Sequence, residues 1–243
     1  MYLNRGLKNM PLVVKNLIII NALFFLARYT LASTLKIDLN SVLGLYYYNS
    51  PEFNPYQLIS YMFMHGGFSH IFFNMFALWM FGTQIENLWG PKRFLNYYLI
   101  TGFGAAFLHY LIIHFQISGL ESYFTSNQIS EIVNSGAFNP SSPLFSKARM
   151  LYGLHHTPVV GASGAVFGLL LAYGMTYPNQ IIYLNLLFPI KAKYFVIIYG
   201  LLEFVMGVQN SAGDNVAHFA HIGGMLFGFL LIKYWKKNDM NFY

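Results

Sequence analysis

Six long apolar segments dominate this chain, and they restrict it to folds that place helices in a lipid bilayer. Of its 243 residues, 56% are apolar and only 9% are charged, whereas a soluble globular domain has about 25% charged residues. Each segment approaches the roughly 20 residues that a helix needs to cross a bilayer, and none alternates like a spanning strand. We therefore expect an all-α polytopic membrane protein, a single domain over 1–243, with spans at 12–33, 68–89, 94–115, 160–177, 193–209 and 216–235.

The basic residues gather on one face of these six spans. An even number of spans puts both termini on the same face, and the loops of the other face contain only Lys36, Lys147 and Arg149 as cations. Because cytoplasmic loops are enriched in Lys and Arg, both termini are predicted to be cytoplasmic. The net charge of +6 then reflects topology and not nucleic-acid binding. Ten of the fourteen cations lie on the terminal face: Arg5, Lys8, Lys15, Lys92, Arg93, Lys191, Lys193, Lys233, Lys236 and Lys237.

The first apolar segment follows Arg5, Lys8 and Lys15 and so resembles a signal peptide. Its apolar stretch is too long for a signal h-region and no convincing cleavage site follows, so we expect a retained span. Without an organelle signal, the expected location is a prokaryotic plasma membrane. The outer loop 116–159 is long for a connection and is expected to be functional or mobile, with His155 and His156 solvated.

Four polar side chains lie at a common depth near the outer ends of the spans. His70 and Asn74 share one helix face through their i, i+4 spacing, Ser163 begins the fourth span, and His221 lies about one turn into the sixth. With a rise of about 1.5 Å per residue, all four lie within about 10 Å of the outer surface. Polar groups inside spans are costly and mark function by default.

Small residues flank two of these side chains. Gly224 and Gly228 continue the helix face of His221, and "GASGAVFG" (161–168) surrounds Ser163 with glycines. Such faces let helices approach closely in lipid, which would bring the serine hydroxyl within about 2.6–3.2 Å of an imidazole base. The pattern predicts hydrolytic acyl transfer, with Ser163 as nucleophile and His221 as general base and acid.

The tetrahedral oxyanion of this reaction needs hydrogen-bond donors. The His70 ring, the Asn74 amide and the backbone N–H of Ser163 are the candidates, each typically worth about 3–4 kcal/mol. Glu86 lies near the inner end of its span and Asp214 lies in a loop, so no carboxylate accompanies the pair and we expect a dyad. No cofactor or metal is expected, and the absence of cysteine excludes disulfides and thiolate sites.

These motifs resemble those of the rhomboid family of intramembrane serine proteases. The resemblance covers about residues 55–235 and rests on "HGGFSHIFFN", "GASG", "AHIGG" and "GTQIENLWG", in this order along a six-span core. It implies a rhomboid-like bundle that cleaves transmembrane protein substrates near their outer ends, with Ser163 and His221 as the dyad and His70 and Asn74 at the oxyanion hole.

The resemblance also carries finer implications. Phe167 should lie against the catalytic imidazole, and the fifth span with the segment 209–215 should form a mobile gate and cap. Some members carry a Trp-Arg pair in the first outer loop where this chain has Tyr56 and Gln57, so the contacts of that loop stay open.

Structural and rival interpretations exist for the same residues. Ser163 alone is more often a helix N-cap, Asn74 a helix-packing amide, and Glu86 a structural contact; Glu203, inside the fifth span, is expected to be protonated or hydrogen-bonded. A histidine-ligated membrane metalloprotein using His70, His218 and His221 is one alternative function, although the HExxH spacing is missing. A catalytically inactive relative that binds membrane clients is another.

Overall fold

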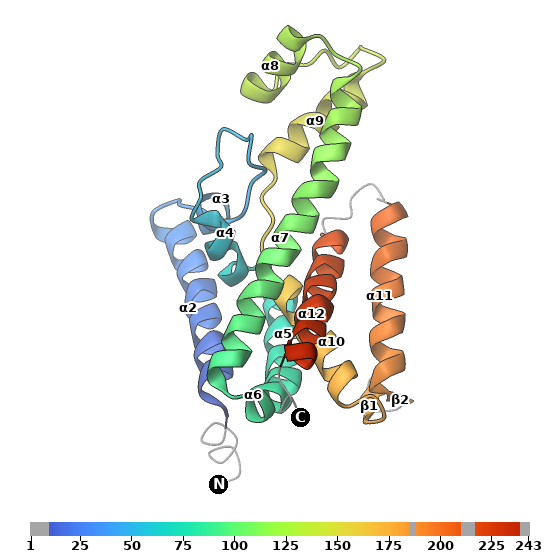
Figure 1. Ribbon diagram of the computed structural model, residues 1–243. Helices are drawn as coiled ribbons and strands as arrows, with labels where there is room; N and C mark the ends of the chain where they lie inside the picture. Colours follow the sequence, from blue (N-terminus) through green and yellow to red (C-terminus); the bar gives the residue numbers. More distant parts are fainter. Residues whose placement is uncertain (1–9, 185–187, 210–216, 239–243) are drawn as a thin grey trace.

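The computed structural model describes residues 10–184, 188–209 and 217–238. Its helices form an elongated bundle with a smaller helical extension at one end (Figure 1). Arg5, Lys8, Asp214 and nearly all of the predicted cap 209–215 lie outside the described residues. In chain order the elements are α2 (Leu12–Thr34), α3 (Leu39–Leu43), α4 (Gln57–Ser60), η1 (Tyr61–Phe63), α5 (Phe68–Ala77), η2 (Leu78–Gly82), α6 (Thr83–Trp89), α7 (Pro91–Glu121), α8 (Ser126–Ser135), α9 (Phe145–His156), α10 (Ser163–Thr176), β1 (Ile181–Leu184), β2 (Phe188–Lys191), α11 (Ala192–Gln209) and α12 (His218–Asn238).

The structure is mostly helical, as predicted, and a helix occupies each predicted span. The expectation of an all-α fold is wrong in one place: β1 and β2 pair as a two-stranded antiparallel sheet between α10 and α11. Among the described residues, α2, α7 and α11 are long and apolar enough to cross a membrane by length and composition. The second predicted span is α5, the π-helical turn η2 and α6 in continuous succession. The fourth, α10, has 14 residues, and α12 ends among cations such as Lys236 and Lys237. The start of α2 and the end of α12 lie at the same end of the bundle (Figure 1), while the count of six spans stays a prediction.

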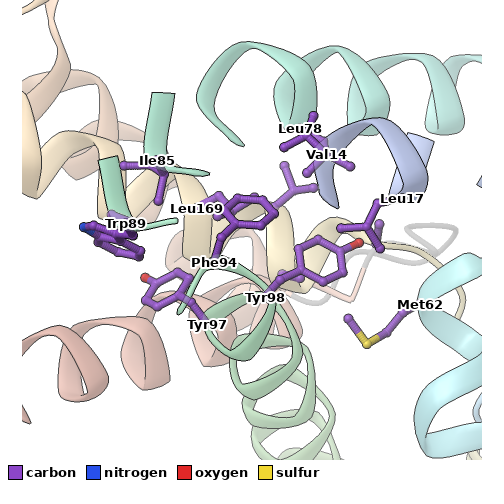
Figure 2. Packing of buried hydrophobic residues seen from close by; sticks show 14 of the residues in the cluster. Val14, Leu17, Met62, Leu78, Ile85, Trp89, Phe94, Tyr97, Tyr98 and Leu169 are labelled. Carbon is purple, nitrogen blue, oxygen red and sulfur yellow. The ribbon is translucent and has the colours of Figure 1, made fainter. Parts of the chain in front are cut away.

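The core of the bundle forms around the first turns of α7. Phe94, Tyr97 and Tyr98 are fully buried, and Figure 2 shows their rings among side chains from other helices, including Trp89 of α6. The Tyr97 hydroxyl donates a hydrogen bond to the carbonyl of Gly168 in α10 at 2.8 Å. Because lipid is as apolar as these side chains, close packing and such interhelical hydrogen bonds hold the helices together.

Glu86 fastens the beginning of α2 to α6. Its two carboxylate oxygens accept hydrogen bonds from the backbone N–H groups of Val13, at 2.9 Å, and Val14, at 2.8 Å. The first turn of a helix leaves these N–H groups without intrahelical partners, and the helix dipole favours a negative charge there. The structural interpretation of Glu86 is therefore confirmed.

The predicted loop 116–159 is largely helical. Helix α7 continues to Glu121 instead of ending near 115, because its apolar residues beyond the bundle face a second core under α8 and α9. A capping box between Thr125 and Gln128 begins α8. The second core consists of Tyr47, Ile113, Ile117, Ile132, Ala148 and Leu151.

His155 and His156 pack against other residues, so the expectation that they are solvated is wrong. His155 is buried, with its ring 5.5 Å from that of Tyr47. The ring nitrogens of His156 contact a Glu52 oxygen at 2.9 Å and the carbonyl of Val133 at 2.7 Å, which links the first outer loop to α8 and α9. Burial favours the protonated form of Glu52, but hydrogen bonds from its neighbours, including His156, outweigh it and lower the pKa of that carboxyl.

Gln57 organises the first outer loop, where the family resemblance left the contacts open. Its buried side chain accepts hydrogen bonds from the N–H groups of Asn54, at 3.1 Å, and Tyr46, at 3.4 Å. Its amide donates to the carbonyls of Val42, at 3.2 Å, and Glu52, at 3.0 Å. A neutral amide thus joins four points of the loop.

Candidate active site

Ser163 is the first residue of α10, and the chain reaches it through a turn that favours glycine. Gly161 has a φ of +132°, a backbone conformation that side chains rarely permit, and its N–H donates to the carbonyl of Tyr61 at 2.9 Å. A methyl group added at Gly161 would lie 2.8 Å from His70 Nε2 and 3.5 Å from Ser163 Oγ. The turn therefore leaves a small space between these two side chains, at a helix N-terminus whose N–H groups lack intrahelical partners.

His221 of α12 meets Ser163 directly. Its Nε2 lies 2.8 Å from Ser163 Oγ, a normal hydrogen-bond distance. The ring of Phe167, one turn along α10, stacks on the imidazole with centroids 4.2 Å apart and an interplanar angle of 5°, as the resemblance implied. The histidine is held on one face by this ring and on one edge by the serine.

Glycines let α10 and α12 approach to backbone contact. A methyl group at Gly224 would collide with the carbonyl group of Gly164. The expectation that small residues bring these two helices together is confirmed at this pair. Not every glycine serves that contact, because a methyl group at Gly168 would instead meet Thr101 of α7, at 2.7 Å.

His70 lies beside the same space, with its ring held from behind. The N–H of Gly66 donates weakly to His70 Nδ1 at 3.4 Å, which favours the tautomer with its proton on Nε2, the nitrogen nearest Gly161. Arg28 of α2 donates to the carbonyls of His65 and Gly66, both at 2.9 Å, and so fixes the turn that begins α5. Arg28 is a cation inside the first predicted span, and no sequence motif marks it as part of the site.

Asn74 is buried one turn after His70 on α5. Its Nδ2 donates to the carbonyl of His70 at 3.0 Å, so its described hydrogen bond lies within its own helix. This contact suits the helix-packing interpretation, and a role for the second amide N–H at the oxyanion stays a prediction.

Glu203 of α11 brings a carboxylate to the histidines, and the prediction that none accompanies the pair is wrong. Its Oε2 lies 2.7 Å from His218 Nδ1 and 2.8 Å from His221 Nδ1. The first contact is a hydrogen bond, whereas His221 Nδ1 has no partner in good hydrogen-bond geometry, so the second is a close electrostatic contact. Glu203 lies six residues before the end of α11, about 9 Å by the helical rise. This is about the depth predicted for the other four site residues, so its position in the sequence could have identified it.

The same two histidines and the carboxylate are the residues of the site that could bind a metal ion. Within the described residues, ligand atoms of Glu203, His218 and His221 lie within 4.8 Å of one another. His70, which the metalloprotein alternative required, does not belong to this group.

Comparison with known proteins matches this chain to rhomboid proteins. The sequence model of the Rhomboid domain matches residues 52–237. RHOMBOID-like protein 12, mitochondrial, of Arabidopsis thaliana is 31% identical over 172 residues, which cover 69% of this chain and 42% of that protein. RHOMBOID-like protein 4 of the same plant is 31% identical over 180 residues, covering 72% and 33%. Rhomboid protease GluP of Bacillus subtilis is 28% identical over 176 residues, covering 72% and 25%.

This chain therefore spans between a quarter and about two-fifths of the length of these relatives. Plant mitochondrial and bacterial proteins both occur among them, so they do not support the prokaryotic plasma membrane as the particular location. The matched segment covers more than half of the chain and includes Ser163, His221, His70 and Asn74. The chain belongs to the rhomboid family of intramembrane serine proteases.

Proposed function

We propose that this chain is an active intramembrane serine endopeptidase that hydrolyses peptide bonds in or near transmembrane segments of other membrane proteins. Family membership supports this reaction class. The observation that carries the proposal for this member is the 2.8 Å contact between Ser163 Oγ and His221 Nε2 across two helices.

In this mechanism Ser163 Oγ attacks the scissile carbonyl carbon while His221 Nε2 takes the hydroxyl proton. His221 then returns that proton to the leaving amine, and an acyl-enzyme remains on Ser163. A water molecule, deprotonated by His221, hydrolyses the ester and restores the serine. The stacked ring of Phe167 keeps the imidazole aligned through both steps.

The negative oxygen of the tetrahedral intermediate would be stabilised by the donors around Gly161. The Nε2 atom of His70 lies beside this space, and the Ser163 N–H at the start of α10 and the second N–H of Asn74 are the other candidates. Each donor of this kind is typically worth about 3–4 kcal/mol in the transition state.

The finer topology belongs to the same proposal. Six spans within one domain over 1–243, with both termini in the cytoplasm, would open the site to the outer side of the bilayer. Substrates would enter laterally between α5 and α11 and be favoured where small or helix-breaking residues unwind them, because a helical peptide bond is shielded. The prokaryotic plasma membrane stays a prediction.

Purified protein in detergent, incubated with a transmembrane reporter that carries a helix-breaking segment, tests this function. The wild type should cleave the reporter at one site, with or without a chelator, and Ser163→Ala should not. Reporter cleavage that continues in Ser163→Ala would refute the serine mechanism, and activity that requires stoichiometric metal would favour the metalloprotein alternative. A wild type without activity would favour the client-binding alternative.

A further inference from the structure

Glu203 occupies a position that the serine–histidine mechanism does not use. Its side chain is 12% exposed, and its carboxylate contacts the imidazoles of His218 and His221. His221 therefore has Ser163 Oγ at Nε2 and a carboxylate at Nδ1, 2.8 Å away on each side. The three groups come from three different helices, α10, α11 and α12, which lie side by side in the bundle (Figure 1).

We propose that Glu203 is a positioning residue for the proposed protease reaction, on which this inference rests: it orients His221 and stabilises its protonated form. A carboxylate beside Nδ1 favours the tautomer with its proton on Nδ1, and this leaves Nε2 free to accept the proton of Ser163. Once His221 is protonated, the nearby negative charge stabilises the imidazolium. Glu203 does not touch the substrate and transfers no proton itself.

The packing of α11 against α12 explains how the carboxylate reaches the ring. Gly200, Glu203 and Gly207 share one face of α11 through their i, i+3 and i+7 spacing. A methyl group at Gly200 would lie 3.2 Å from Met225, and one at Gly207 would lie 2.9 Å from a ring carbon of Phe219. Both glycines thus allow the close approach of α11 to α12 that places Glu203 beside the histidines.

After Val196, the residues of α11 outside this face are exposed. Its buried residues, Ala192, Phe195 and Val196, all lie in its first five positions, far along the helix from Glu203. The outer half of α11 therefore contacts α12 mainly through the face that carries Glu203.

Other ionisable groups also face His221, and the pH dependence reflects all of them. His218 on α12 hydrogen-bonds the same Glu203 oxygen, while His70 of α5 and His109 of α7 interact electrostatically with His221. Among these groups Glu203 is the acidic one in the described part of the site. Removing Glu203 should therefore shift the pH–rate profile in the opposite direction to removing a cationic neighbour.

The distances favour direct contact over a bridging metal. Two ligands of a tetrahedral zinc ion lie about 3.3 Å apart or more, given metal–ligand bonds of about 2.0–2.2 Å. The contacts of Glu203 Oε2 with His218 and His221 are shorter than this, at 2.7 and 2.8 Å. The first is a hydrogen bond, and the second is a close electrostatic contact.

The test compares initial rates of reporter cleavage, over a range of pH, for full-length wild type, Glu203→Gln, Glu203→Asp and Ser163→Ala. Glu203→Gln should lower kcat by about 10- to 100-fold with KM within about twofold, less than the roughly 10⁴-fold effect of a well-aligned triad carboxylate. The acid limb of its pH–rate profile should move to lower pH, because the imidazolium loses a neighbouring negative charge. Glu203→Asp, which keeps the charge, should recover part of kcat and retain the wild-type limb.

Glu131→Gln is the matched control, since it makes the same change on the exposed face of α8 and should leave rate and profile unchanged. If wild type cleaves, Ser163→Ala does not, and Glu203→Gln equals wild type at every pH, this inference is overturned while the protease function stands. If Glu203→Gln does not fold, Glu203→Ala takes its place. A normal kcat and an unshifted pH–rate profile in that variant would also overturn the inference. Zinc bound in the active wild type at one equivalent and lost in Glu203→Gln would also overturn it. An inactive wild type would instead refute the proposed function and, with it, this role.

Discussion

Replacing His221 with alanine is expected to lower the rate of reporter cleavage at least about 10⁴-fold, since removing the base of a serine protease costs up to about 10⁶-fold. The serine hydroxyl is a poor nucleophile unless a neighbouring base accepts its proton. In the proposed mechanism this base is His221 Nε2, which lies 2.8 Å from Ser163 Oγ. Initial rates in detergent, together with thermal unfolding curves to show that the variant is folded, measure the effect.

His114→Ala is the matched control for this substitution. His114 also lies in a long helix, α7, but its ring hydrogen-bonds Tyr47, at 3.0 Å, near the second core. This variant should cleave the reporter within about twofold of the wild-type rate, because one hydrogen bond typically contributes only about 1 kcal/mol to stability. A His221→Ala variant that retains wild-type activity would show that another group activates the serine.

Replacing Gly224 with valine is expected to have the second largest effect. Its new side chain would occupy the position of the Gly164 backbone, so α12 and α10 would have to separate. Overpacking of this kind typically costs about 1–3 kcal/mol and more where backbone must move. Separation would also part His221 from Ser163, so we expect a lowered midpoint of thermal unfolding and a loss of cleavage of at least about 100-fold.

The same substitution at Gly119 provides its control. Gly119 is on α7, is exposed, and has open space where a side chain would extend. Valine is a somewhat better helix former than glycine, so Gly119→Val should unfold at the wild-type temperature or slightly above. Equal stability and activity of Gly224→Val and wild type would contradict the close packing of α10 against α12.

The positions of the helices and the contact between Ser163 and His221 could be predicted from local sequence. Apolar runs long enough for a bilayer located the helices, and the glycines around Ser163 and His221 predicted the helix contact that brings these residues together. Both signals are local, because an apolar run or a regular spacing of glycines within one helix indicates which of its faces carries apolar or small residues. The capping box at Thr125 and Gln128 was equally local, and reading it would have predicted α8 within the loop 116–159.

The partners of Glu203 and Gln57 could not be predicted in the same way. Glu203 reaches His221 because α11 lies against α12, and the sequence states neither the rotation of α11 nor which neighbour it meets. Gln57 joins four backbone groups of an irregular loop whose path has no periodic pattern. Such long-range contacts depend on tertiary structure, and only the presence of a carboxylate inside a span marked Glu203 in advance.

Labelling with a fluorophosphonate probe tests most directly whether Ser163 is a nucleophile activated across the interface of α10 and α12. Mass spectrometry of the labelled wild type should locate a single phosphonyl adduct on Ser163, with slow labelling in His221→Ala and none in Ser163→Ala. An adduct on a different residue, or equal labelling of wild type and Ser163→Ala, would contradict the account.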